Sequence, residues 1–187
     1  MKINGPKLTK ITSERKLTPE QLAAALPKPS ERRKQGDVAL KKVRNWMAGK
    51  DHPRCSPAEA AAMAQALGVE TKDLVRFTST FRFARGSWRK IGLVAELIRG
   101  RRFDEADALL QFSPKRAAVQ VRKALNAARA DAEAAGAAVD RLVVAESRVG
   151  NAMRIKRFQP KDRGRAHPIL KRTSHIVVGV EEMPARR

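Results

Sequence analysis

The chain has no tyrosine, and aromatic residues make up only 4% of its 187 residues. Its core must therefore be built mainly from aliphatic side chains. Cys55 is the single cysteine, which excludes an intrachain disulfide and a cysteine-rich metal site. We expect a shielded thiol without a chemical role, in a reducing compartment such as the cytoplasm. No apolar run approaches the roughly 20 residues of a membrane-spanning helix, and the first ten residues lack the apolar region of a secretory signal.

Acidic residues are scarce, with 19 Asp and Glu against 40 Lys and Arg, which gives a net charge of +21. Such an excess repels itself unless a polyanion neutralises it. Nucleic acid is favoured over an anionic membrane, because the basic residues are not confined to one amphipathic helix. A hydrophobic content of 42% argues for a folded core and against a disordered basic tail.

The patterns of catalytic and metal sites are also missing. The three histidines, His52, His167 and His175, lie far apart and have no cysteine or carboxylate at ligand spacing. We find no Ser–His–Asp set, no paired carboxylates in an apolar setting and no glycine-rich phosphate loop. The sequence therefore predicts a protein that is not an enzyme and that holds no cofactor and no metal.

The first half predicts four short helices. Residues 18–21 (TPEQ) and 56–59 (SPAE) are capping boxes, each with a proline at the first helical position. A polar stretch at 27–36 precedes a helix over 37–49, and a final short helix covers 73–75. The apolar residues expected to face this core are Leu22, Ala25, Leu26, Val38, Leu40, Val43, Trp46, Met47, Ala62, Met63, Ala66 and Leu67.

The second half mixes strands and helices. Short apolar runs predict strands at residues 80–84, 142–145 and 176–180. Three helices are expected between the first two strands, over residues 87–100, 103–110 and about 20 residues from Ser113. Their expected core residues are Ile91, Val94, Ala95, Ile98, Phe103, Ala106, Leu109, Leu110, Ala117, Val121, Ala124, Leu125, Ala128 and Ala132.

Residues 148–172 stand out by charge, with nine Lys or Arg and one acid, Asp162, for a local net charge of +8. The segment has little apolar content after Phe158, so it cannot form a core of its own. Phosphates of RNA would neutralise it, whereas the alternative is a solvated charged loop. Trp88 at the start of a basic helix could stack on RNA or on protein, and both interpretations remain open.

Four motifs resemble one known family. Residues 85–100 (RGSWRKIGLVAELIRG) look like the opening helix of the large-subunit ribosomal protein twenty-two family. Residues 113–118 (SPKRAA) and 126–133 (NAARADAE) are similar to the two ends of its long helix, and 164–176 (GRAHPILKRTSHI) is the most specific match. The resemblance covers about 105 residues, from 79 to 187.

The resemblance implies an α+β fold, with three helices packed on a small antiparallel sheet and a long basic β-hairpin at about 148–172. Family members bind large-subunit rRNA, and their hairpin lines the nascent-peptide exit tunnel. We therefore expect a structural constituent of the large subunit in the cytoplasm. Its expected partners are large-subunit rRNA, neighbouring ribosomal proteins and the nascent peptide.

The residues that this resemblance assigns to rRNA binding are mostly basic, and they lie in both halves of the hairpin and around the first and last helices. They are Arg82, Arg85, Ser87, Arg89, Lys90, Lys115, Arg116, Arg154, Lys156, Arg157, Lys161, Arg163, Arg165, His167, Lys171, Arg172, Ser174 and His175. The expected hairpin tip comprises Gln159, Pro160, Lys161, Asp162, Arg163, Gly164, Arg165 and Ala166. The chain departs from the family at Trp88, Gly92 and Asp162, and residues 150–155 permit two alignments, on Met153 or on Ile155.

Residues 14–77 resemble the helix-turn-helix domain of the lambda-repressor and Cro type, so we expect a small all-α, helix-turn-helix-like domain over residues 1–78. The tight turn of that family is replaced here by residues 27–36. A DNA-binding regulator is the alternative function, with Lys41, Lys42, Arg44 and Asn45 as possible nucleic-acid contacts. We expect a separately folding module that attaches to the ribosome, although rRNA, DNA, a ribosomal protein or no partner remain open.

Overall fold

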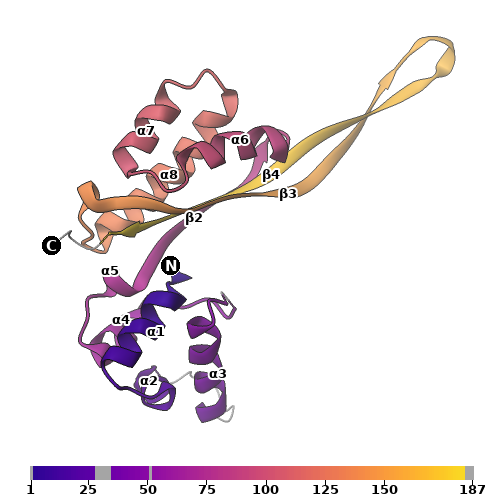
Figure 1. Cartoon of the computed structure of the whole chain (residues 1–187). Coiled ribbons are helices and arrows are strands. Elements are labelled where there is room, and N and C mark those ends of the chain that lie inside the picture. Colours follow the sequence, from indigo (N-terminus) through magenta and orange to yellow (C-terminus); the bar gives the residue numbers. More distant parts are fainter. Residues whose placement is uncertain (1, 28–34, 51, 184–187) are drawn as a thin grey trace. The chain divides into compact units, whose positions relative to one another are not determined.

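The computed structural model describes residues 2–27, 35–50 and 52–183 (Figure 1). The chain divides into two compact units. The first comprises residues 1–77 and 135–137, and the second comprises residues 78–134 and 138–187. Strand β2 (Val75–Arg85) starts in the first unit and continues in the second.

The described part of the first unit is built from five helices and a short strand pair. The helices are α1 (Gly5–Glu14), α2 (Pro19–Ala25), α3 (Gln35–Met47), α4 (Pro57–Leu67) and α5 (Thr71–Leu74). Strand β1 (Lys2–Ile3) pairs with the first two residues of β2.

Two predictions for the helices and strands of this unit were wrong. Helix α1 was not predicted, although Asn4 caps it and Pro6 stands in its first turn. Val75 was assigned to the last short helix but begins β2, in keeping with its β-branched side chain. Residues 28–34 of the predicted polar stretch lie outside the described residues.

The predicted capping boxes are confirmed. The Gln21 N–H donates to Thr18 Oγ1 at 3.4 Å, and the Thr18 N–H donates to Gln21 Oε1 at 2.9 Å. Ser56 and Glu59 make the same reciprocal pair at the start of α4. Each box satisfies donors that the first turn of a helix leaves open.

The core of the first unit forms where the helices meet. Trp46 is 2% exposed, as predicted, and its Nε1–H donates to the carbonyl of Pro53 at 2.7 Å. The predictions for Ala25, Val38 and Ala66 were wrong, since these side chains are exposed. Short helices bury a narrow stripe, and in α4 that stripe runs through Ala60, Met63, Ala64 and Leu67. The fully buried large side chains of this unit include Leu8, Leu22, Val43, Met63, Leu67 and Leu74.

The second unit is α+β, as predicted. Its sheet has the order β2-β4-β3, and three helices cover one face of it (Figure 1). The helices are α6 (Trp88–Ile98), α7 (Phe103–Gln111) and α8 (Arg116–Ala134), and the strands are β3 (Leu142–Pro160) and β4 (Ala166–Glu182). Two 3-10 turns, η1 (Val139–Arg141) and η2 (Asp162–Gly164), precede and follow β3. Among the residues that the structure describes, no helix combines the length and apolarity needed to cross a membrane.

The inward face of α6 follows the predicted period, whereas Leu109 of α7 and Ala117 of α8 were predicted to face the core and are only half-buried. All four expected core residues of α6 are buried, and so are Val121 and Leu125 of α8. Alanines at 118, 124, 128 and 132 line the same face of α8, where small side chains let the helix approach β4 closely. Helix α8 begins at Arg116, two residues after Pro114, so Ser113 does not cap it.

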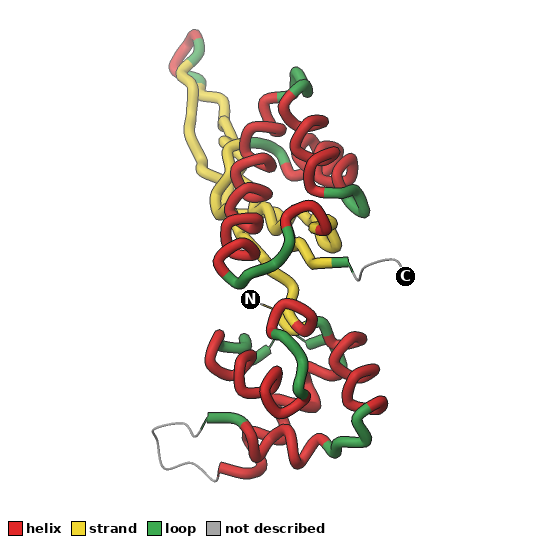
Figure 2. The backbone as a smooth tube through the Cα atoms, turned by 90° about the vertical axis from the view of Figure 1, so that its left-hand side faces the viewer, coloured by secondary structure: helices red, strands yellow, loops and turns green. Residues whose placement is uncertain are grey.

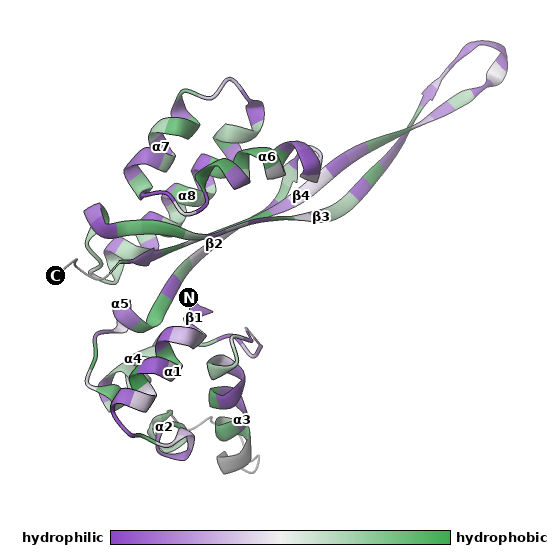
Figure 3. Cartoon of the chain, in the orientation of Figure 1, coloured by the Kyte–Doolittle hydropathy of each residue, from purple (hydrophilic) through white to green (hydrophobic). Residues whose placement is uncertain are grey.

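Strands β3 and β4 form one continuous hairpin. They pair antiparallel from Leu142 opposite Glu182 to Pro160 opposite Ala166. The predicted core strands and the predicted basic arms are therefore two parts of the same strands, whose far ends continue past the helices (Figure 2). Coloured by hydropathy, the hairpin becomes mostly hydrophilic toward its tip (Figure 3).

We predict that Val121→Asp prevents the second unit from folding. Val121 is 0% exposed, so its replacement would bury an unpaired carboxylate at a cost of about 3–5 kcal/mol, a large share of a domain's stability. Val119→Asp on the same helix is the control, because Val119 is 60% exposed. A cooperative thermal transition in the Val121 variant, at the control's midpoint, would contradict the assigned face.

We also predict that Gly5→Ala destabilises the first unit by about 1–3 kcal/mol. A Cβ at Gly5 would lie 2.6 Å from the Trp46 carbonyl oxygen and 2.9 Å from the Gly49 nitrogen, and both are backbone atoms. Gly92→Ala is the control, since a Cβ there meets nothing within 4 Å and a helical alanine gains about 0.5–1 kcal/mol.

The Cys55 thiol gives a local measurement for this pair of variants. Burial raises its pKa to about 12, with Glu59 adding to the effect, so the folded protein holds it protonated at neutral pH. Alkylation at pH 8 should therefore be slow in the wild type and in the Gly92 variant. Alkylation should be faster in the Gly5 variant. Equal rates in all three proteins would show that the first unit does not need the close approach of Gly5 to the backbone of Trp46 and Gly49.

Candidate nucleic-acid interface

The distal hairpin is a basic ribbon without a core. From Arg154 to Arg172 its strands are held by the backbone ladder, and nearly every side chain is exposed. Its basic residues are Arg154, Lys156, Arg157, Lys161, Arg163, Arg165, Lys171 and Arg172, all exposed. Within the described residues, none of these eight makes an ion pair.

The tip closes through the predicted residues. The Lys161 N–H donates to the Arg165 carbonyl at 2.7 Å, and the Arg165 N–H donates to the Asp162 carbonyl at 3.2 Å. Arg163 and Gly164 both have positive φ, at 54° and 69°. This backbone turns the chain within a few residues and leaves the side chains of Lys161, Arg163 and Arg165 in solvent.

A β-bulge marks the base of this ribbon. Asn151 pairs with Ser174 and Arg154 pairs with Arg172, so residues 152–153 oppose the single residue Thr173. Thr173 is 3% exposed, and its hydroxyl donates to the Met153 carbonyl at 2.5 Å. In β4 the buried residues begin at Thr173, so core packing ends at the bulge.

The turn at Gly86 gathers residues from four elements of the second unit. The Gly86 N–H donates to the Arg172 carbonyl at 3.1 Å, and the Ser174 hydroxyl donates to the Gly86 carbonyl at 3.0 Å. Gln120 of α8 donates to the Arg85 carbonyl at 3.3 Å. These contacts bring the end of β2, the starts of α6 and α8, and the base of the hairpin together, and each contributes exposed Lys or Arg.

The starts of α6 and α8 carry the wrong charge for an isolated helix. Negative side chains stabilise the positive end of a helix dipole, and α7 has Asp104 and Glu105 there. The first turns of α6 and α8 have no acid and contain basic residues, Arg89 and Lys90 in α6 and Arg116 in α8. A phosphate bound there would offset this repulsion and accept from the open N–H groups.

Trp88 lies at the surface beside this turn. It is 43% exposed, and the guanidinium carbon of Arg89 lies 5.6 Å from its ring centroid. A cation over an indole is a favourable pair that leaves the other ring face available. The structure therefore permits stacking on RNA or on protein.

The structure exposes most of the predicted rRNA-binding residues and assigns three others to internal contacts or partial burial. Ser174 is buried and Ser87 is half-buried. His175 is half-buried, and its Nδ1 accepts from the Phe83 N–H at 3.3 Å, with the two rings edge to face at 4.8 Å. This contact holds Phe83 at a φ of +56°. The exposed members are Arg82, Arg85, Arg89, Lys90, Lys115, Arg116, Arg154, Lys156, Arg157, Lys161, Arg163, Arg165, His167, Lys171 and Arg172.

The four candidates in α3 divide into two pairs. Lys42 is bound to Glu59 at 2.7 Å, and Asn45 donates to the His52 carbonyl at 3.1 Å. Burial acts to raise the pKa of Glu59, but hydrogen bonds from Lys42 and Ser56 outweigh it and lower the pKa. Lys41 and Arg44 are exposed and have no such contact.

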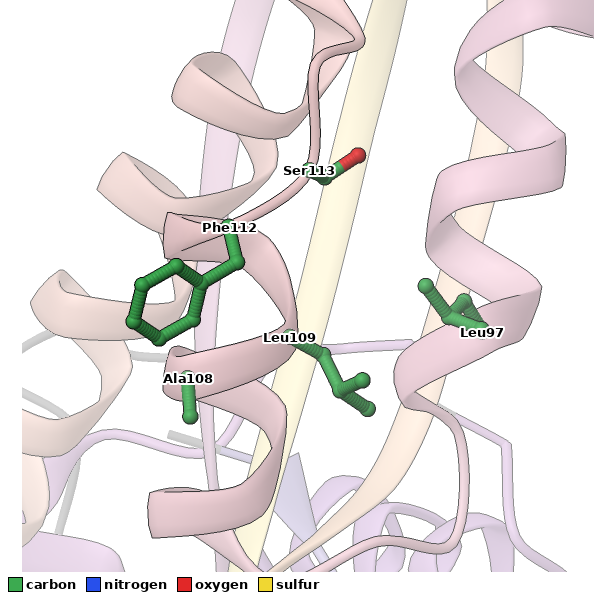
Figure 4. A pocket seen from close by; sticks show the side chains of 5 residues that line it. All are labelled: Leu97, Ala108, Leu109, Phe112 and Ser113. Carbon is green, nitrogen blue, oxygen red and sulfur yellow. The ribbon is translucent and has the colours of Figure 1, made fainter.

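An apolar hollow between α6 and α7 was not predicted. Leu97, Ala108, Leu109, Phe112 and Ser113 line it, and Figure 4 shows Leu97 and Leu109 facing each other across it. Phe112 is 82% exposed. The lining has no charged side chain, so this surface is chemically different from the basic ribbon. Among the described residues, no group of three or more His, Cys, Asp or Glu could hold a metal ion.

Comparison with known proteins agrees with this geometry. A family model described as ribosomal protein L22p/L17e matches residues 79–181, more than half of the chain. The large ribosomal subunit protein uL22 of Clostridium beijerinckii is 45% identical over 102 residues, which is 54% of this chain and 92% of the relative. The uL22 proteins of Beijerinckia indica and Methylocella silvestris are each 48% identical, over 56% and 54% of this chain and 81% and 80% of their own lengths.

The fold, the basic ribbon and these relatives define a structural protein of the large ribosomal subunit, not an enzyme. The chain belongs to the ribosomal protein L22p/L17e family. Membership associates it with rRNA and other ribosomal proteins, on the cytoplasmic ribosome. These matches start at residue 79 or cover little more than half of the chain, so they lend no support to the DNA-binding alternative.

We predict that Thr173→Val loosens the base of the ribbon. Losing the hydroxyl donor to Met153 should cost about 0.5–1.5 kcal/mol. Hydrogen exchange of the amides at 152–155 should become faster, whereas Thr173→Ser, which keeps the hydroxyl, should leave it near the wild-type rate. Equal exchange in the valine and serine variants would show that the bulge does not depend on this bond.

Proposed function

We propose that the second unit binds large-subunit rRNA through the distal hairpin and the basic residues around the Gly86 turn, and that the hairpin tip reaches the wall of the nascent-peptide exit tunnel. The observation that carries this proposal is the ribbon of eight exposed, unpaired Lys and Arg described above. Like charges on a two-stranded ribbon repel each other, and a two-stranded hairpin alone is at best marginally stable in water. RNA phosphates would remove the repulsion and release counterions.

The proportion of arginine supports RNA as the partner. Five of those eight residues are arginine: Arg154, Arg157, Arg163, Arg165 and Arg172. The guanidinium group forks onto phosphate oxygens and stacks on unpaired bases, which an ammonium group cannot do equally well. The basic first turns of α6 and α8 supply a second place for phosphate, beside the base of the basic ribbon.

The length of the ribbon supports a role for its tip beyond anchoring. Residues 154–160 of β3, the arm of the ribbon beyond the bulge, extend about 23 Å at the usual rise of a strand. A ribbon two strands wide can enter a channel through RNA that a globular unit could not enter. Its tip would then present Asp162 and the neighbouring basic side chains to a peptide in that channel.

We predict that replacing Lys161, Arg163 and Arg165 by Ala leaves the second unit folded and weakens rRNA binding. The three side chains are exposed and have no part in the core. In salt titrations with a cognate rRNA fragment, the slope of log K against log salt should become shallower by about 0.7–0.9 per lost phosphate contact. An unchanged slope would show that the tip does not touch phosphate.

Asp162→Asn is the matched control, because it removes a negative charge from the same tip. It should keep or strengthen binding and should not make the slope shallower. The Asp162 contact that closes the tip comes from its backbone carbonyl, so the amide side chain preserves the turn. Weaker binding in both variants would point to loop geometry and not to charge.

A further inference from the structure

The first unit lies outside the matched family region, and one of its surfaces is basic. We propose that this surface, the α3 face, binds the phosphate backbone of ribosomal RNA duplexes. The α3 face is defined by Lys41, Arg44, Lys50 and Arg54, all of which are exposed. The proposal rests on the family membership and not on the function proposed for the hairpin.

Helix geometry places the first two cations together. Lys41 and Arg44 stand three residues apart in α3, a spacing at which side chains are neighbours on one helix surface. The opposite side of α3 carries Val43 and Trp46, which are buried in the core. The two cations therefore face solvent from a rigidly packed element.

Hydrogen bonds fix the loop that supplies the other two cations. The Asn45 side chain donates to the His52 carbonyl at 3.1 Å, and the Trp46 indole donates to the Pro53 carbonyl at 2.7 Å. The Lys50 N–H donates to the Asn45 carbonyl at 2.8 Å. The loop after α3 is thus tied back along the last turn of the helix, so Lys50 and Arg54 stay close to that turn.

Charge on this surface is not balanced locally. Residues 41–54 contain five Lys or Arg and one acid, Asp51, which gives a net charge of +4. Lys42 is neutralised by Glu59, but the four cations of the α3 face make no ion pair with any described residue. Arg44 in the last turn of α3 is explained by the helix dipole. That dipole acts over one turn and gives no reason for Lys41 or Arg54.

The chemistry of this face suits phosphates better than base edges. The major groove of an RNA duplex is too deep and narrow for side chains to read base edges, and Asn45 is already committed to the loop. Lysine and arginine spread over a helix and a fixed loop match the spacing of backbone charges. RNA is the duplex present at high local concentration around a large-subunit protein, because the second unit holds the first one there.

Lysine footprinting of the full chain tests the proposal. The protein is acetylated with and without a saturating 20-base-pair RNA duplex, and the modification of each lysine is measured by mass spectrometry. We expect the reactivity of Lys41 and Lys50 to fall several-fold in the complex. Lys10 and Lys16, which are exposed elsewhere in the same unit, should keep their reactivity. Unprotected Lys41 and Lys50 at saturation would overturn the proposal.

The same experiment separates this inference from the function proposed for the hairpin. Protection of Lys161 reports on the hairpin, whereas protection of Lys41 and Lys50 reports on the α3 face. A DNA duplex and intact large subunits form the other two arms. Equal protection by RNA and DNA supports phosphate contact. Protection by one DNA sequence but not by RNA, or protection in subunits but not by RNA alone, would assign the face to DNA or to a protein and overturn the proposal.

Two triple variants complete the test. Replacing Lys41, Arg44 and Arg54 by Gln should abolish the protection of Lys50 by RNA. Replacing Lys10, Arg15 and Lys16 by Gln removes the same charge from exposed positions in and after α1 and should leave Lys50 protected. Circular dichroism should be unchanged in both, since all six side chains are exposed. Protection of Lys50 that survives the first set would overturn the proposal.

Discussion

The backbone ladder between β3 and β4 is the constraint on which the second unit depends. Its first half lies under the helices, where Leu142, Val144, Ile176 and Val178 are buried. Its second half has no core and keeps its geometry because the same ladder continues past the Thr173 bulge. A rigid, buried base therefore holds a charged extension in a defined direction. The buried apolar residues lie at one end of the hairpin, and the exposed basic residues lie at the other.

The separation of buried apolar residues from exposed basic residues explains how a chain of net charge +21 can fold. Among the described residues, the cations lie outside the cores, on an extended ribbon and at two helix starts, where solvent screens their repulsion. Helix α7 shows the contrast, because its first turn is acidic in the usual way and its Asp107 is bound by Arg122 at 2.7 Å. Helices α6 and α8 give up that stabilisation, and in an RNA-bound state the phosphate would supply it.

Sequence reasoning predicted the elements that depend on local signals. The capping boxes at Thr18 and Ser56 and the buried stripe of α6 could be read directly, because caps and helical periods are properties of a few neighbouring residues. Helix α1 was missed although Asn4 is a good cap, because its interior mixes threonine and serine with few apolar residues. Val38 and Ala66 were assigned inward because an apolar residue at helical spacing does not reveal how narrow the contact with the core is. The bulge at residues 152–153 depends on a partner strand, so no local pattern could place it.

The candidate sites also depend on contacts between distant segments, which neighbouring residues in the sequence do not reveal. Lys41 and Lys42 are adjacent and chemically identical, and no local sequence pattern distinguishes them. The fold separates them completely, because Glu59 lies within 2.7 Å of Lys42 while Lys41 faces solvent. Ser174 and His175 differ from their exposed neighbours for the same reason, through contacts with Gly86 and Phe83. A basic composition identifies nucleic acid as the partner, but the cations that remain for that partner are those that the fold has not already bound.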